Sequence, residues 1–227
     1  MQISPETQLF IREHQTDDVR ALALQARKYP NVDMPTAITQ IAGRQVAAEK
    51  IPSWRDTDDI WYPKHLSLEQ CSSEVTARYK ATLLKGNSLT DLTGGFGIDC
   101  AFLAAKFKSA TYVERQQELC EIAAHNFPIL NLNHINVKNE DGVSYLQAMS
   151  PVDCIFLDPA RRNEHGGKTV AISDCANDIC VNLIVGMSQN YNCIFCKDLY
   201  SITNSCCGFF NSCVDNHCTG DTGCSAA

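Results

Sequence analysis

The sequence of 227 residues lacks the features that mark membrane and secreted proteins. No apolar run approaches the roughly 18 residues that a membrane-spanning helix needs. The first ten residues, MQISPETQLF, have neither the basic start nor the apolar stretch of a signal peptide. Lysine and arginine together number 19 against 26 acidic residues, so no overall positive charge is available for nucleic acid. We therefore expect a cytoplasmic protein, and any contact with nucleic acid would need a local basic patch.

Cysteine, by contrast, is abundant, and seven of the 13 cysteines lie from Cys193 onwards. Without a secretory signal, we expect reduced thiols rather than a disulfide scaffold. A metal site in this tail is an alternative, but only Cys193 and Cys196 have the two-residue gap that is typical of zinc ligands. We predict no metal, and we predict that residues 201–227 form a disordered or frameshifted tail.

The most informative stretch is SLTDLTGGFG at residues 88–97. It predicts a strand at 88–92, a glycine turn at 93–97 and a helix at 98–107. Glycine allows backbone N–H groups at such a turn to approach a ligand closely. The cluster alone is a weak signal, but Glu114 follows about 20 residues later at the end of the next strand. An acid at that position typically holds a ribose.

Strand and helix patterns alternate regularly after this point, which predicts an α/β fold with parallel strands and helices on both faces. The predicted strands cover residues 88–92, 110–114, 134–138, 153–157 and 192–196, and the helices between them include 116–127, 143–149 and 173–188. Acidic residues follow four successive strands: Asp91, Glu114, Asp141 and Asp158. Ligands of open α/β sheets bind at the carboxyl ends of the strands, so we expect these acids to line a site.

The segments DLTGGFG, YVE, NEDG and LDPAR resemble motifs I to IV of class I S-adenosylmethionine-dependent methyltransferases. With YPKHLSLEQCSSEVTARYKA, they are similar to a bacterial family whose methyltransferase domain precedes a THUMP-like domain. We expect this chain to lack that second domain. The resemblance implies a Rossmann-like sheet, of which about five strands are readable, and S-adenosyl-L-methionine as the cofactor. The implied cofactor-binding residues are Asp91, Thr93, Gly94, Gly95, Gly97, Glu114, Asp141 and Gly142.

Each of these residues has an expected role. The glycines would give room for the methionine part of the cofactor, and Asp91 would orient its amino group. Glu114 would accept both ribose hydroxyls. Asp141 would accept from the adenine amino group, with Gly142 allowing close approach, although Asp-Gly is also ordinary turn chemistry.

The segment Asp158-Pro159-Ala160-Arg161 is expected to face the methyl acceptor, with Asp158, Pro159 and Arg161 as catalytic residues. It is nearest to the D-P-P-R form of RNA base methyltransferases, and arginine can stack on a base or hold a phosphate. We therefore predict a methyltransferase acting on structured RNA, with Arg161 and Arg162 in a basic patch. The alternatives are a protein or small-molecule methyltransferase, or a truncated cofactor-binding remnant without catalysis.

The chain divides into an N-terminal helical domain at 1–66, a methyltransferase domain at 67–200 and the tail at 201–227. The N-terminal helices are expected to begin near Pro5, at Thr16 and near Pro35. Trp54 and Trp61 are expected in a loop, where they pack this domain onto the next. A helix from 67 to 84, re-capped near Ser72 and Ser73, should present an apolar face of Val75, Tyr79, Thr82 and Leu83.

Overall fold

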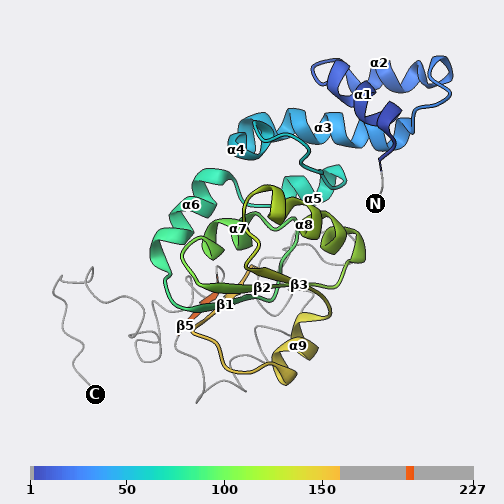
Figure 1. Ribbon diagram of the computed structural model, residues 1–227. Helices are drawn as coiled ribbons and strands as arrows, with labels where there is room; N and C mark the ends of the chain where they lie inside the picture. Colours follow the sequence, from blue (N-terminus) through green and yellow to red (C-terminus); the bar gives the residue numbers. More distant parts are fainter. Residues whose placement is uncertain (1–2, 159–192, 197–227) are drawn as a thin grey trace, which may run out of the picture.

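The computed structural model describes residues 3–158 and 193–196 (Figure 1). The helices are α1 (Pro5–Glu13), α2 (Val19–Leu24), the 3-10 helix η1 (Ala26–Lys28), α3 (Met34–Lys50), α4 (Pro52–Arg55), α5 (His65–Gln70), α6 (Glu74–Leu83), α7 (Ile98–Ala104), α8 (Gln117–Ile129) and α9 (Gly142–Ala148). The strands are β1 (Ser88–Asp91), β2 (Ser109–Glu114), β3 (Ile135–Asn139), β4 (Cys154–Leu157) and β5 (Cys193–Cys196). None of these helices combines the length and the apolar character that crossing a membrane requires.

The five strands form one parallel sheet in the order β3-β2-β1-β4-β5. The register brings Asp91 of β1 beside Tyr112 of β2 and Phe156 of β4. The strand order reverses between β1 and β4, so the carboxyl ends of these two strands flank the crevice where such sheets bind ligands. The predicted Rossmann-like α/β fold is confirmed, and the strand bounds differ by one residue at most. The helix predicted at 173–188 lies outside the described residues.

Helices cover both faces of the sheet, as predicted. Helices α6, α7 and α8 lie on one side and α9 lies on the other (Figure 1). The larger core joins α6, α7 and α8 to sheet residues such as Leu89, Tyr112 and Phe156. The smaller core lies on the α9 side and includes Val113 and Ile155. Alternate residues of a strand point to opposite faces, which is why neighbours in β2 belong to different cores.

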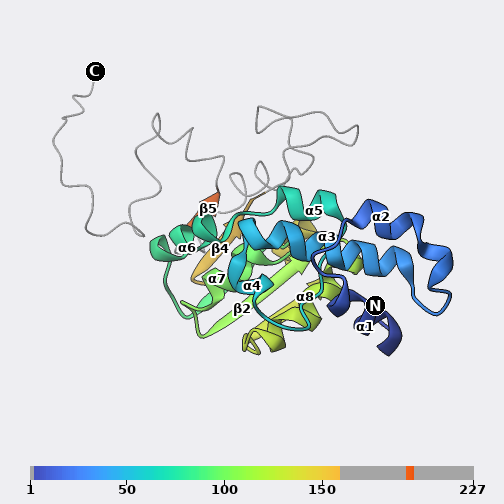
Figure 2. The same cartoon turned by 90° about the horizontal axis from the view of Figure 1, so that it is seen from above.

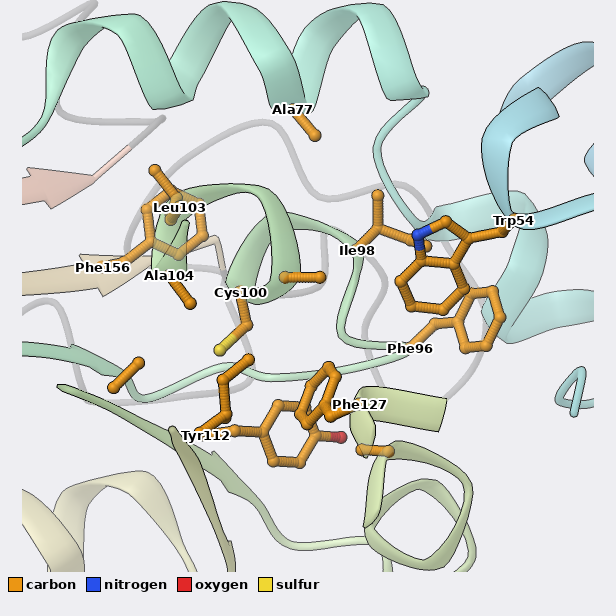
Figure 3. Packing of buried hydrophobic residues seen from close by; sticks show 14 of the residues in the cluster. Trp54, Ala77, Phe96, Ile98, Cys100, Leu103, Ala104, Tyr112, Phe127 and Phe156 are labelled. Carbon is orange, nitrogen blue, oxygen red and sulfur yellow. The ribbon is translucent and has the colours of Figure 1, made fainter. Parts of the chain in front are cut away.

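Aromatic side chains connect the glycine turn to the larger core (Figure 3). The ring of Trp54 meets Phe96 of the turn edge-on, with centroids 5.1 Å apart. Below the turn, Tyr112 and Phe127 form a second edge-on pair at 5.6 Å. Edge-on pairs of this kind contribute about 0.5 to 1.5 kcal/mol beyond the area that they bury, so they help to stabilise the turn.

The N-terminal helices have a small core of their own, made of Phe10, Leu22, Met34, Ala37 and Ile41. Helix α3 extends from this core into the larger one, where its later residue Ala47 is fully buried. Figure 2 shows α3 running from the N-terminal helices towards the sheet domain. A domain boundary at residue 66 remains a prediction.

The two tryptophans pack between these parts of the chain. Trp54 lies on α4 rather than in a loop, and only 2% of its surface is exposed. Trp61 stacks on His125 of α8, with the ring centroids 3.6 Å apart. The Trp61 backbone also exchanges two hydrogen bonds with the Asn126 side chain, both 2.9 Å long.

Two further sequence-based details are wrong. The second N-terminal helix begins after Asp18, not at Thr16, because the Asp18 carboxylate accepts from the N–H groups of the first turn. In α6, Val75 and Tyr79 are largely exposed. Ser73 does re-cap the chain there, as predicted. The face that packs inwards contains Glu74, Ala77, Lys80 and Ala81, because Lys80 has ionic partners beneath the helix.

Gly43 gives a test of the packing between α3 and the loop that follows. A methyl group at this position would fall well inside van der Waals contact with the Tyr62 ring. Helix propensity alone predicts that Gly43→Ala stabilises the protein by about 1 kcal/mol. We expect Gly43→Ala to lower the free energy of unfolding, measured in urea, by about 1 to 3 kcal/mol, because overpacking against Tyr62 outweighs the gain in helix propensity. Ala48→Gly on the exposed side of α3 calibrates the propensity term, and a stabilised Gly43→Ala variant would show the close approach to be wrong.

Candidate functional site

The glycine turn joins the end of β1 to the start of α7. Gly95 and Gly97 have φ angles of 54° and 88°, in the left-handed region that other residues rarely adopt. Gly97 is the residue immediately before α7, so the turn presents the amino end of that helix to the carboxyl edge of the sheet. Among the described residues, a Cβ atom at Gly95 would meet no atom closer than the Thr93 carbonyl oxygen at 3.8 Å, so this side of the turn is open to that extent.

The other side of the turn lies on aromatic rings. A Cβ atom at Gly94 would collide with the Tyr112 ring, and one at Gly97 would lie 3.0 Å from Phe127. The Tyr112 hydroxyl donates a 2.5 Å hydrogen bond to the Gly95 carbonyl oxygen. Packing therefore requires glycine at 94 and 97, and of the three predicted glycines, Gly95 is the one with open space beside it.

Glu114 at the end of β2 faces this turn. Its Oε2 atom accepts from the Gly95 N–H at 3.0 Å, and its Oε1 atom accepts from the Gln116 N–H at 2.8 Å. Each carboxylate oxygen has about two acceptor sites, so both retain capacity for a further donor. The two bonds hold the carboxylate in one orientation, half-exposed beside the open side of the turn.

Thr93 links the ends of β1 and β4. Its N–H donates to Asp91 Oδ1 at 2.9 Å, and its hydroxyl lies 3.4 Å from the same oxygen. The Thr93 hydroxyl also accepts from the Asp158 backbone N–H at 2.7 Å. A glycine could make only the backbone bond. Threonine at this position therefore sets the spacing between the two strand ends on either side of the crevice.

The Asp91 carboxyl group is almost completely buried, with 1% of the residue exposed. Burial raises its pKa to about 8, and the nearby Asp99 and Asp158 carboxylates add to this effect. The Thr93 N–H and the Lys80 ammonium oppose it without overcoming it. Asp91 is therefore protonated and uncharged at neutral pH.

A buried ionic cluster lies beside Asp91, and the sequence analysis did not identify it. Lys80 Nζ of α6 is 3.0 Å from Asp99 Oδ2 and 3.0 Å from Asp158 Oδ2. It also donates to the Ser72 hydroxyl at 2.9 Å, and that hydroxyl donates to Asp99 Oδ2 at 2.8 Å. Asp99 Oδ1 is buried and has no hydrogen-bond partner. The signal that could have revealed the lysine is its position three residues after Ala77, on the same helix face.

Asp141 caps α9, because its Oδ1 atom accepts from the N–H groups of Val143 and Ser144. The neighbouring Glu140 N–H donates to the Glu114 carbonyl oxygen at 3.1 Å, so this turn lies next to the end of β2. Gly142 is buried at the first position of α9. The remaining predicted site residues, Pro159, Arg161 and Arg162, lie outside the described residues.

Three of the four strand-end acids thus meet around one turn. Glu114 contacts it through Gly95, and Asp91 and Asp158 contact it through Thr93. Among the residues that the structure describes, no group of three or more His, Cys, Asp or Glu is arranged to hold a metal. The predicted cysteine-rich tail lies beyond them.

A pocket of about 410 Å³ lies elsewhere, between α1, α3 and α8. Its lining includes Arg12, Arg44, Trp61 and His125 but none of the strand-end acids. Arg44 and Asp58 provide opposite charges 3.9 Å apart on its wall. This pocket is therefore separate from the strand-end site.

The sheet order, the glycine turn after β1 and the acid that ends β2 define a class I S-adenosylmethionine-dependent methyltransferase. The comparison with protein families gives the same class. Residues 45–163, more than half of the chain, match the family model described as protein-L-isoaspartate(D-aspartate) O-methyltransferase. The chain belongs to this family, which confirms the predicted methyltransferase class and its cofactor, S-adenosyl-L-methionine.

Two relatives extend the comparison. The crystal structure of a proposed methyltransferase from Porphyromonas gingivalis W83 is 29% identical, with a TM-score of 0.68 over 84% of this chain and 47% of that one. An uncharacterized RNA methyltransferase of Mycoplasma mobile is 36% identical over 76 residues, which are 33% of this chain and 21% of that protein. The present chain thus spans about half the length of the first relative and about a fifth of the second.

The residues at the strand ends fit this cofactor. The cofactor offers a ribose with two hydroxyl donors, and the oriented Glu114 carboxylate has one spare acceptor site on each oxygen. The open side of the turn at Gly95 leaves space for a ligand next to that carboxylate. No side chain of the described turn fills this space.

The raised pKa of Asp91 predicts an inverse dependence of stability on pH. An unfolded aspartate titrates near pH 4, so between about pH 4 and pH 8 the folded protein binds more protons than the unfolded one. The free energy of unfolding contributed by this group therefore falls as the pH rises through that window. Between pH 5.5 and pH 8.5, the free energy of unfolding of the parent chain should fall. In the Asp91→Asn variant, this fall should be smaller by at least about 1 kcal/mol, measured by urea unfolding. Equal losses in both proteins would contradict a protonated Asp91.

Proposed function

We propose that this protein is an S-adenosylmethionine-dependent methyltransferase that methylates the exocyclic amine of a base in structured RNA, such as tRNA or rRNA. The observation that carries the proposal is the Asp158 carboxylate, held by a buried lysine at the end of β4 and linked to the glycine turn by Thr93. The RNA methyltransferase name of the Mycoplasma mobile relative supports the same acceptor class.

On the cofactor side, Glu114 would accept hydrogen bonds from the ribose hydroxyls, and the backbone at Gly95 would leave room for the methionine part. Asp141 and Gly142 would meet the adenine, and the protonated Asp91 carboxyl lies beneath the turn. The cofactor supplies the methyl group when it is bound. The chain contributes mostly position, because an in-line transfer needs a close and dry approach rather than covalent help.

On the acceptor side, Asp158 accepts a hydrogen bond from the amine of the base. Positive charge would develop on that nitrogen as it gains a substituent, and a fixed carboxylate would stabilise this charge most in the transition state. The proton that the methylated nitrogen then loses would pass to this carboxylate or to water. Pro159 and Arg161 would complete the surface that faces the acceptor, with Arg161 stacking on the base or binding a phosphate.

The second candidate is methylation of a protein carboxyl group, which the family match favours. The charges at the site argue against it. Two carboxyl groups, those of Asp99 and Asp158, flank the single ammonium group of Lys80. A carboxylate acceptor would be repelled by this cluster, whereas an amine is attracted. The amine of a base is therefore a better match than a carboxylate for the groups around Asp158.

The role of Glu114 can be tested by cofactor binding. Glu114→Gln keeps the size of the side chain but removes its charge and one acceptor oxygen. We expect calorimetry to show affinity for S-adenosylmethionine reduced by roughly 2 kcal/mol, or about thirtyfold. Glu118→Gln, on α8 and paired with Lys64, is the matched control and should bind as the parent does. Equal affinities for both variants would rule out the ribose role of Glu114.

The acceptor can be identified with cofactor that carries a tritiated methyl group, offered with unmodified tRNA and rRNA transcripts or with an isoaspartyl peptide. We expect label in RNA, and we expect Asp158→Asn to lower its rate by roughly a hundredfold or more without changing cofactor affinity. Asp153→Asn makes the same exchange at the opposite end of β4 and is the control. Label in the peptide alone would favour the second candidate, and label in neither substrate would contradict both.

A further inference from the structure

Lys80 is the most deeply buried ion of the site, with 5% of its side chain exposed. Each of its three N–H donors has an acceptor, namely Asp99 Oδ2, Asp158 Oδ2 and the Ser72 hydroxyl. The ammonium group also lies 5.1 Å from the centre of the Phe156 ring, which provides a favourable electrostatic contact from below.

Burial opposes the charge of this lysine, but the Asp158 and Asp99 carboxylates outweigh burial and raise the pKa of Lys80. The ammonium is thus charged at neutral pH. A buried ion pair is seldom more stable than an apolar replacement of the same size, because both charges lose their water. Stability alone therefore gives a weak reason for a lysine at a helix position that Ala77 and Ala81 flank.

Geometry gives a stronger reason, since Lys80 completes the immobilisation of Asp158. The Asp158 backbone N–H is held by the Thr93 hydroxyl at 2.7 Å, and its Oδ2 atom is held by Lys80 at 3.0 Å. Backbone and side chain are thus fixed from two different elements, the glycine turn and α6. The backbone bond holds the main chain at Asp158 in place, and the bond to Lys80 restricts rotation of its carboxylate.

Asp99 and Ser72 hold the lysine in turn. Asp99 lies in the first turn of α7, and Ser72 lies in the link between α5 and α6. The hydrogen bond from Ser72 to Asp99 closes a ring of contacts around Nζ. The lysine therefore cannot turn away from Asp158 without breaking bonds to two further elements.

We propose that Lys80 is a positioning residue for methyl transfer, which fixes the side chain of Asp158 towards the incoming acceptor. This inference rests on the proposed function, because it takes Asp158 as the group that meets the acceptor nitrogen. Lys80 does not touch the acceptor itself. It acts through Asp158, and Asp99 serves as its second counter-ion.

The test compares two cofactor analogues and needs no turnover. S-Adenosylhomocysteine lacks the methyl group, whereas sinefungin carries an amine in its place, and a well-placed Asp158 should favour that amine. We expect calorimetry to show that the parent chain prefers sinefungin. Lys80→Met should reduce this preference about tenfold while S-adenosylhomocysteine binds nearly unchanged, and Lys80→Arg should restore part of it.

Lys80→Met leaves two buried carboxylates without a cation and can fail to fold, so the double variant Lys80→Met/Asp99→Asn is measured beside it. In an Asp158→Asn background, the same double change should have no further effect on the preference, because the lysine acts through that carboxylate. The measurement in the Asp158→Asn background therefore separates a positioning role of Lys80 from a general effect on packing.

The outcomes distinguish the inference from the function on which it rests. A parent chain that binds neither analogue would overturn the proposed function and this inference with it. A parent chain that binds both without preference, or a double variant that keeps the preference, would overturn the inference alone. A parallel loss of both affinities would assign Lys80 a structural role only and would also overturn it.

Discussion

The position of the glycine turn on two aromatic rings is the constraint on which the rest of the site depends. Gly94 lies directly on Tyr112, Gly97 lies against Phe127, and the Tyr112 hydroxyl holds the Gly95 carbonyl. Because the turn is held from below, its N–H at Gly95 meets Glu114 and its threonine meets Asp158. The site is thus built on a rigid hydrophobic base rather than on a free loop.

Several ionisable groups lie close together above these rings, an arrangement that costs stability and is typical of functional sites. Three carboxyl groups lie close together, and their repulsion together with burial keeps a proton on Asp91. The ammonium of Lys80 offsets part of the remaining negative charge. Carboxyl groups thus outnumber the ammonium at the place where a positive centre is expected to form. Sites tuned by burial and by like charges in this manner are common among enzymes.

The sequence was sufficient to predict the parallel sheet, its alternation with helices and the positions of the strand-end acids, because these follow from periodicity and from local glycine chemistry. It was not sufficient for contacts between distant elements. Lys80 and Asp99 are 19 positions apart on different helices, and no local pattern pairs them. The apolar face of α6 was misassigned for the same reason, since an ionic partner beneath a helix outweighs the hydrophobicity of Val75 and Tyr79.

The shared helix α3 has a consequence for how the protein unfolds. Its first half contributes Met34 and Ile41 to the N-terminal core, and its second half contributes Ala47 to the core beneath the glycine turn. A helix propagates order along its length, because each added residue costs less than the first turn. Loss of either core therefore weakens the support of the other, and the two parts are expected to melt as one cooperative unit.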